Sequence, residues 1–175
     1  MRQGTNPAER EILSADRLRE TADYPDAARR ARGPVAVIEC FQEIPCDPCR
    51  DACPRGAIRV DGLTSLPRLD TERCNGCGTC VSMCPGQAIF VMDASGSRGI
   101  VTLAWEILPL PVPGERVTAG GRQGEPVCEA VVLRVADTPG LNKTRLVTLS
   151  VPAGALDEVR SVVGWRKGRR CDEGR

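Results

Sequence analysis

Apolar residues in this chain occur in short runs and not in long amphipathic stretches. Residues 35–38 form one such run, rich in β-branched side chains, which predicts a short strand. Two further runs, residues 56–60 and 87–92, predict strands that pair the two halves of one small unit. Residues 47–52 and 78–83 predict short helical turns. The first half of the chain is therefore expected to be a small α+β unit.

The second half of the chain has a different texture, because turns rich in proline and glycine separate its apolar runs. These runs are residues 99–107, 117–118, 128–135 and 145–151. Several short strands joined by such turns predict a small all-β domain, either barrel-like or sandwich-like. Residues 153–163 then predict one short C-terminal helix, with Asp157, Glu158 and Arg160 on its solvent-facing side.

We interpret the chain as four consecutive segments. The first begins a helix at Asn6-Pro7 and is either partly ordered or docked on a partner subunit. The second ends at Ser95-Gly96-Ser97, which has the composition of a linker. The segments are an N-terminal arm (1–33), the α+β unit (34–96), the small β domain (97–165) and a basic tail (166–175).

Composition argues against several classes of protein. The chain of 175 residues has a formal charge of +1 and 3% aromatic residues, which argues against a nucleic-acid-binding surface. No apolar stretch reaches about 18 residues, so we expect no membrane span. Residues 1–31 contain no apolar segment of the signal-peptide kind, so we expect a cytoplasmic protein. Histidine and phosphate-binding glycine motifs are absent, and we assign no catalytic residue.

Eight of the ten cysteines lie between residues 40 and 84, and their spacing carries the chemistry. The second half of this stretch reads Cys74-x2-Cys77-x2-Cys80-x3-Cys84-Pro85, the spacing that ligates iron–sulfur clusters. The first half reads Cys46-x2-Cys49-x3-Cys53-Pro54, the same run without its first cysteine. A structural zinc site would instead bring two spaced pairs of ligands. The spacing therefore favours iron–sulfur over zinc.

The two cysteine runs are halves of an internal repeat. Ligands, prolines and apolar residues align at one constant offset, which chance does not readily produce. The aligned positions are Cys46, Cys49, Cys53, Pro54, Ala57, Ile58 and Val60 with Cys77, Cys80, Cys84, Pro85, Ala88, Ile89 and Val91.

Residues 34–93 resemble the dicluster ferredoxin fold, a small α+β unit with two pseudo-symmetric halves. In two-cluster ferredoxins the fourth cysteine of each run ligates the other cluster. The resemblance therefore implies a first cluster held by Cys46, Cys49 and Cys84, which lacks one ligand. It implies a second, complete [4Fe–4S] cluster, whose ligands are Cys53, Cys74, Cys77 and Cys80.

Three readings remain for the fourth position of cluster one. Cys40 reaches in from three residues upstream of the equivalent position, Glu43 ligates through a carboxylate oxygen, or the site holds a three-iron [3Fe–4S] cluster. We favour Cys40, because thiolate is the softer ligand. Cys128 and Cys171 lie outside the motifs and are assigned no metal.

The two cluster loops differ in backbone donors. Gly76 and Gly78 permit tight turns with N–H groups aimed at sulfur, whereas Pro45 and Pro48 have no N–H to donate. Hydrogen bonds to sulfur help to set the reduction potential. We expect cluster one to have the lower potential.

The chemistry that this sequence predicts is one-electron transfer. Residues 38–49 resemble the ferredoxin-type small subunits of FAD-dependent amine or amino-acid dehydrogenases, of the proline and hydroxyproline type. That resemblance implies an electron-transfer subunit whose flavoprotein partner subunits carry FAD or FMN. One alternative is a free-standing dicluster ferredoxin with accessory domains. Another is a partner-binding protein in which the clusters are structural.

Overall fold

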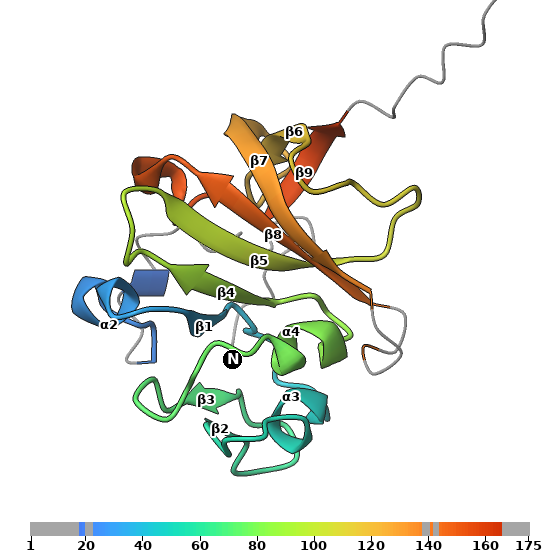
Figure 1. The fold of residues 1–175 in the computed structure, drawn as a ribbon. Coiled ribbons are helices and arrows are strands. Elements are labelled where there is room, and N and C mark those ends of the chain that lie inside the picture. The colour runs from blue at the N-terminus through green and yellow to red at the C-terminus, as the bar shows by residue number, and fades with distance from the viewer. Residues whose placement is uncertain (1–17, 20–22, 138–140, 142–143, 166–175) are drawn as a thin grey trace, which may run out of the picture.

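The computed structural model describes residues 18–19, 23–137, 141 and 144–165 (Figure 1). The predicted helix start at Asn6-Pro7, the basic tail and Cys171 lie outside these residues. The elements are α2 (Ala27–Ala31), β1 (Val35–Ile38), α3 (Pro48–Asp51), β2 (Ile58–Arg59), β3 (Arg68–Leu69), α4 (Thr79–Met83), β4 (Ile89–Asp93), β5 (Gly99–Trp105), β6 (Arg116–Gly120), β7 (Pro126–Ala136), β8 (Arg145–Val151), a 3₁₀ turn (Ala153–Ala155) and β9 (Ser161–Trp165).

In the described part of the chain, seven strands form one antiparallel sheet in the order β1-β4-β5-β8-β7-β6-β9. The predicted segment boundary at residues 96 and 97 falls inside the β4–β5 hairpin, where Asp93 pairs with Ile100. The Asp93 carboxylate accepts the backbone N–H of Ser95 at 2.8 Å and tightens this turn. Linkers and hairpin turns share the same small polar residues, so Ser95-Gly96-Ser97 could be read either way. One sheet therefore runs through both predicted segments.

The predicted strands after the two Cys-Pro steps form as β2 and β4, and they join the two halves without pairing with each other. Strand β4 pairs with β1, and β2 pairs with β3 in a separate two-stranded ribbon. Each strand that follows a Cys-Pro step thus pairs with the strand that leads into the cysteine loop of the other half. An apolar run predicts that a strand forms, but which strand it pairs with depends on the path of the intervening loops.

The internal repeat is visible in the backbone of these two pairs. Ile38 pairs with Ile89 in one of them, and the equivalent pair in the other is Leu69 with Ile58. Beyond each pair, Glu39 N donates to Ala88 O and Asp70 N donates to Ala57 O, both at 2.8 Å. The two halves therefore share register as well as sequence. In Figure 1, α3, α4 and the β2–β3 ribbon lie together on one side of the large sheet.

The predicted C-terminal helix over residues 153–163 is also wrong. Only a 3₁₀ turn forms at Ala153–Ala155, and β9 then pairs with β6. Val162 and Val163 are β-branched, and the edge of β6 offers hydrogen bonds to their backbone. Arg160 is consequently buried, with 7% of its surface exposed, and does not face solvent.

Strands β1 and β4 are buried on both faces of the sheet. Val37, Phe90 and Met92 pack into a large core with the side chains of β5 to β8. On the opposite face, Val35 and Ile89 pack with Cys49, Cys80 and Val81. The cysteine-rich layer is therefore built directly on the strands that the rest of the sheet holds in place.

The described part of the N-terminal arm docks on its own chain. Asp157, just after the 3₁₀ turn, accepts hydrogen bonds from Arg19 at 2.7 Å and from Tyr24 at 2.9 Å. Arg30 forms an ion pair with the same carboxylate and lies over the Tyr24 ring. These contacts hold the described part of the arm against the residues that follow the 3₁₀ turn, and α2 lies against β4, where Ala94 N donates to Arg30 O at 3.0 Å.

We predict that Tyr24, the chain's single tyrosine, titrates abnormally. Burial first, then the charge and hydrogen bond of Asp157, raise the pKa of Tyr24 to about 12. An unfolded tyrosine has a pKa of about 10. Because the folded pKa is raised, this group stabilises the fold fully below about pH 10, and its contribution is lost as the pH rises toward 12.

Absorbance of tyrosinate reports this one residue directly. We expect a midpoint near 12 in the native protein and near 10 in denaturant, with Asp157→Asn moving the native midpoint part of the way back. The Tyr24→Phe variant supplies the baseline for absorbance from other groups. A native midpoint near 10 would contradict the buried Tyr24–Asp157 contact.

Candidate functional site

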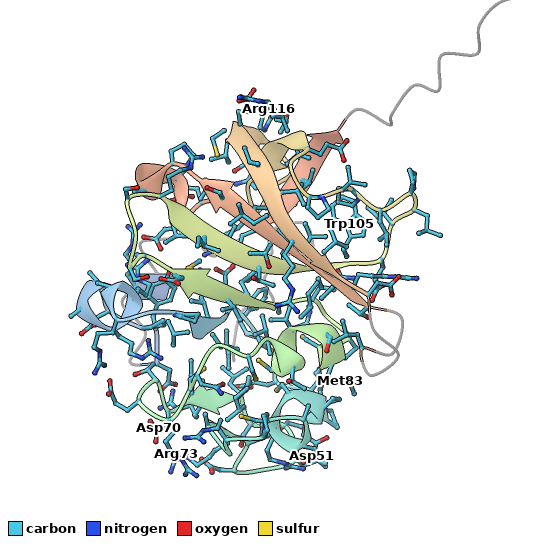
Figure 2. The ribbon with its side chains drawn as sticks, viewed as in Figure 1. Asp51, Asp70, Arg73, Met83, Trp105 and Arg116 are labelled. Carbon is cyan, nitrogen blue, oxygen red and sulfur yellow. The ribbon has the colours of Figure 1, made fainter. Side chains whose placement is uncertain are left out.

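Eight thiols lie in two groups of four beneath the sheet. The Cys49 thiol interacts electrostatically with those of Cys84, Cys40 and Cys46. The Cys80 thiol interacts most strongly with those of Cys74, Cys77 and Cys53, and least with that of Cys49. Figure 2 shows several sulfur atoms, in yellow, between the large sheet and the α3 and β2–β3 elements. These groups have the members that the ferredoxin resemblance implies, with Cys40 in the incomplete set; ligation itself stays a prediction.

One buried thiol in each group is held where it does not ionise readily by itself. Burial, followed by the neighbouring thiols, raises the pKa of Cys49 to about 11 and that of Cys80 to about 12. Metal ligation requires the deprotonated thiolate, and the metal's positive charge must compensate both effects. Each group of four thiols therefore suits a metal group that carries positive charge.

The second group lines a hollow of its own. All four of its cysteines line this space, together with the apolar residues Ala36, Ile58 and Leu69. We call the two groups cluster site one (Cys40, Cys46, Cys49, Cys84) and cluster site two (Cys53, Cys74, Cys77, Cys80). Among the described residues, no three cysteine or acidic side chains converge on the position of a single metal ion.

Backbone N–H groups donate to the sulfurs, as the environment of an iron–sulfur cluster requires. Ala57 N lies 3.2 Å from Cys53 Sγ, and its repeat equivalent, Ala88 N, lies 3.4 Å from Cys84 Sγ. Ala36 N also donates to Cys74 Sγ at 3.4 Å. The donors of these three bonds lie outside the Gly76–Gly78 turn, so the contribution that the turn makes to the cluster at site two stays a prediction.

Gly76 and Gly78 serve the loop through their conformation. Both have positive φ, +66° and +82°, which side chains of L-residues rarely adopt. A Cβ on Gly76 would lie 2.6 Å from Pro34 Cβ and 2.7 Å from the Pro34 carbonyl oxygen. The loop can therefore approach the start of β1 only with glycine at this position.

Cluster site one differs at its first ligand position. Residues 41–45 are exposed, and Glu43 lies in the middle of them. Cys40 is half-buried, and the charge of its thiolate raises the pKa of the Cys46 and Cys49 thiols. The carboxylate whose charge raises the pKa of Cys46 is that of Asp47. This arrangement favours Cys40 over Glu43 as the residue that completes the set.

Glu39, which precedes Cys40, is held by two arginines. Its carboxylate accepts hydrogen bonds from Arg122 at 2.8 and 3.0 Å and from Arg160 at 2.6 Å. Glu39 and Arg122 side chains are each 10% exposed and Arg160 is 3% exposed. Arg160 also donates to the carbonyls of Leu156 and Val159. We call Glu39, Arg122 and Arg160 the Glu39 clamp.

Sequence reasoning missed the Glu39 clamp. The sequence pattern predicts Arg160 on a wet helix face, and Arg122 stands in a glycine-rich turn that shows no pattern of its own. Only the sheet pairing brings both to the end of β1. Cys128, in β7, lies outside both thiol groups, and burial raises the pKa of its thiol.

Comparison with known proteins gives the class of this module. Residues 67–90 match the 4Fe-4S binding domain family, Fer4. This stretch contains the complete cysteine motif from Cys74 to Cys84. The chain therefore carries a 4Fe–4S ferredoxin-type module.

Curated relatives, two of them named as ferredoxin-like or ferredoxin-type proteins, match parts of the chain. A polyferredoxin-like subunit of aliphatic sulfonate oxidoreductase from Pyrococcus furiosus is 36% identical over 89 residues, 46% of this chain and 49% of that protein. One subunit of an ion-translocating oxidoreductase complex from Methanosarcina acetivorans is 48% identical over 55 residues, 31% of this chain and 19% of the relative. The ferredoxin-type protein NapF of Haemophilus influenzae is 43% identical over 61 residues, 32% and 35% of the two chains.

The chain thus spans between about a fifth and a half of these relatives. No solved structure matches it. Among the described residues, no helix has the length and apolar character needed to cross a membrane.

Proposed function

We propose that this chain is an electron-transfer subunit of a multi-subunit oxidoreductase and relays single electrons through two [4Fe–4S] clusters. The observation that carries the proposal is the arrangement of eight thiols in two groups of four, each with a cysteine from the opposite half of the repeat. That exchange of Cys53 and Cys84 between the halves matches the ligand pattern of two-cluster ferredoxins.

When bound, each cluster supplies one-electron redox chemistry, and the chain's own residues prepare its surroundings. Ile58 and Leu69 line cluster site two with apolar surface, while the backbone N–H groups of Ala36 and Ala57 donate to its sulfurs. Cys40 completes cluster site one, so that both sites offer four thiolates. The described residues contain no acid–base constellation beside either site, and we assign them no catalytic role.

The proposal that the chain works within a complex draws on the relatives. The Pyrococcus and Methanosarcina proteins are named as subunits of oxidoreductase complexes. A finer proposal is that the partners here are flavoproteins with FAD or FMN, of the amine or amino-acid dehydrogenase kind, and it rests on the stretch from Ile38 to Cys49. Co-purification with a flavin-containing subunit tests it. A chain that stays alone and keeps full redox activity would favour the free-standing ferredoxin.

The test of the proposed function is metal content and EPR of protein purified without oxygen. We expect about eight irons and eight sulfides per chain, with two interacting reduced signals. In Cys40→Ala we expect about seven irons and an oxidised three-iron signal, because cluster site one keeps only three thiolates. Cys128→Ala, the same substitution at a thiol outside both groups, should match the unaltered chain.

Two results would contradict these expectations at different levels. Zinc without sulfide would overturn electron transfer and leave a structural metal protein. A full iron content and unchanged four-iron signals in Cys40→Ala would keep electron transfer but remove Cys40 from the ligand set, leaving the Glu43 carboxylate as the alternative fourth ligand.

A further inference from the structure

One arginine of the N-terminal arm reaches the loop that carries the first cysteine of cluster site two. Arg29 lies in α2, and its side chain donates to the carbonyl oxygens of Thr71 at 2.7 Å and Cys74 at 2.6 Å. The same guanidinium donates to the carbonyls of Gly33 and Pro34, immediately before β1. Arg29 therefore ties the Cys74 loop to the start of the large sheet.

Among the described residues, the positive charge of Arg29 has no carboxylate of its own. All four hydrogen bonds of its side chain within this part of the chain end on backbone carbonyls. The neighbouring Glu72 pairs with Arg32, and Asp26 accepts the backbone N–H of Arg29 as the N-cap of α2. The guanidinium is partly buried, so solvent screens its charge less than that of an exposed arginine.

We infer that Arg29 is a positioning residue for Cys74 and raises the reduction potential of the cluster at site two, an inference that rests on the proposed function. Four thiolates give an iron–sulfur cluster a net negative charge, and reduction adds one more electron. A fixed positive charge beside the ligand's own peptide group stabilises the reduced form over the oxidised form.

In the described part of the chain, cluster site one has no such arginine at the equivalent place. The repeat position of Cys74 is Glu43, in the exposed run of residues 41–45. The arginines of the Glu39 clamp are neutralised in part by the Glu39 carboxylate between them. Arg29 therefore raises the reduction potential of the cluster at site two alone. Cluster one keeps the lower potential, which is the order that Pro45 and Pro48 also favour.

The experiment is a potentiometric EPR titration of the complete, cluster-loaded chain and its Arg29→Gln, Arg29→Lys and Arg32→Gln variants. Cys77→Ala identifies the signal of site two. At the wild-type midpoint we expect Arg29→Gln to lower the ratio of reduced to oxidised site two about three- to tenfold, tenfold being 59 mV for one electron. The signal of site one should not move. Arg32→Gln, which removes an exposed arginine from the end of the same helix, should leave both potentials unchanged.

Arg29→Lys separates charge from geometry, because lysine keeps the charge but cannot span several carbonyls. We expect its site-two ratio to stay within about twofold of wild type. A fall as large as in Arg29→Gln would overturn the charge effect. If Arg29→Gln loses the site-two cluster alone, the positioning role is supported, and Arg29→Lys then measures the charge effect.

The wild-type sample distinguishes failure of the inference about Arg29 from failure of the proposed function. Both clusters present in wild type and Arg29→Gln, with identical site-two potentials, would overturn the role of Arg29 and leave the proposed function intact. Wild-type protein that holds no iron–sulfur cluster would instead overturn the proposed function.

Discussion

Replacing Gly76 by alanine is expected to remove the cluster at site two while site one keeps its own. The backbone at Gly76 has φ +66°, a conformation that costs roughly 1–2 kcal/mol for residues with a side chain. The added methyl group would also lie 2.6–2.7 Å from the Cβ and backbone of Pro34, so the loop must move away from β1. That movement displaces Cys74 and Cys77, which flank the glycine. Iron content should fall from about eight to about four per chain.

Gly86→Ala is the matched control for this variant. Gly86 follows a Cys-Pro step near the other cluster loop, has open space around its Cα and lacks a positive φ. Its alanine variant should keep about eight irons. The readout is iron and sulfide analysis together with EPR, which separates loss of one cluster from loss of both. Full iron in Gly76→Ala would show that Cys74 and Cys77 do not need the close approach to Pro34.

The two thiol groups were accessible from the sequence because ligand spacing and local structure are coupled. Cys77 and Cys80 flank the start of α4, and the equivalent Cys46 and Cys49 flank the start of α3, so a fixed spacing gives a fixed local geometry. The internal repeat also carries through to strand register, where Ile38–Ile89 and Leu69–Ile58 correspond. These features depend on residues that are close together in the chain.

Contacts between residues that are far apart in the sequence could not be predicted in the same way. Strands β4 and β5 meet in a hairpin because Asp93 and Ser95 close a turn, yet the same residues also suit a linker. The prediction that Arg160 faces solvent assumed a helix over residues 153–163. The chain instead forms strand β9 there, because the edge of β6 offers hydrogen bonds to its backbone. Arg29 gave no sequence signal, since its acceptors are backbone carbonyls from two separate loops. The order of residues in a single sequence does not indicate which backbone carbonyls a side chain will reach.

The segments outside the ferredoxin repeat share one structural role. Arg29 of the arm holds the carbonyl of Cys74, the first cysteine of the complete motif. Arg122 and Arg160 of the β domain hold Glu39, which precedes Cys40, the first cysteine of the incomplete set. In both cases an arginine from outside the repeat fixes the entry to a cluster loop. A two-cluster module needs no such support for its inner cysteines, which short helices already position.

Replacing Glu39 by glutamine is therefore expected to destabilise the protein strongly. The substitution keeps the size of the side chain but removes the negative charge between the Arg122 and Arg160 guanidinium groups. Arg122 keeps a longer contact, 3.4 Å, with the half-exposed carboxylate of Glu158. Removing one partner from a buried ion pair typically costs about 3–5 kcal/mol. We expect Glu39→Gln to lower the free energy of unfolding by that amount, as measured by urea unfolding of cluster-loaded protein without oxygen. Because Cys40 is the next residue, the site-one EPR signal should also weaken first as urea rises.

Glu129→Gln tests whether burial is the cause. Glu129 forms an ion pair with Arg116, but the two side chains are 64% and 72% exposed. Figure 2 places Arg116 at the end of the sheet far from Met83 and Asp51, which mark the cysteine layer. An exposed pair contributes about 0–1 kcal/mol, so this variant should unfold close to wild type. Equal losses in the two variants would mean that solvent reaches the Glu39 clamp, and that its arginines do not hold the entry to the Cys40 loop.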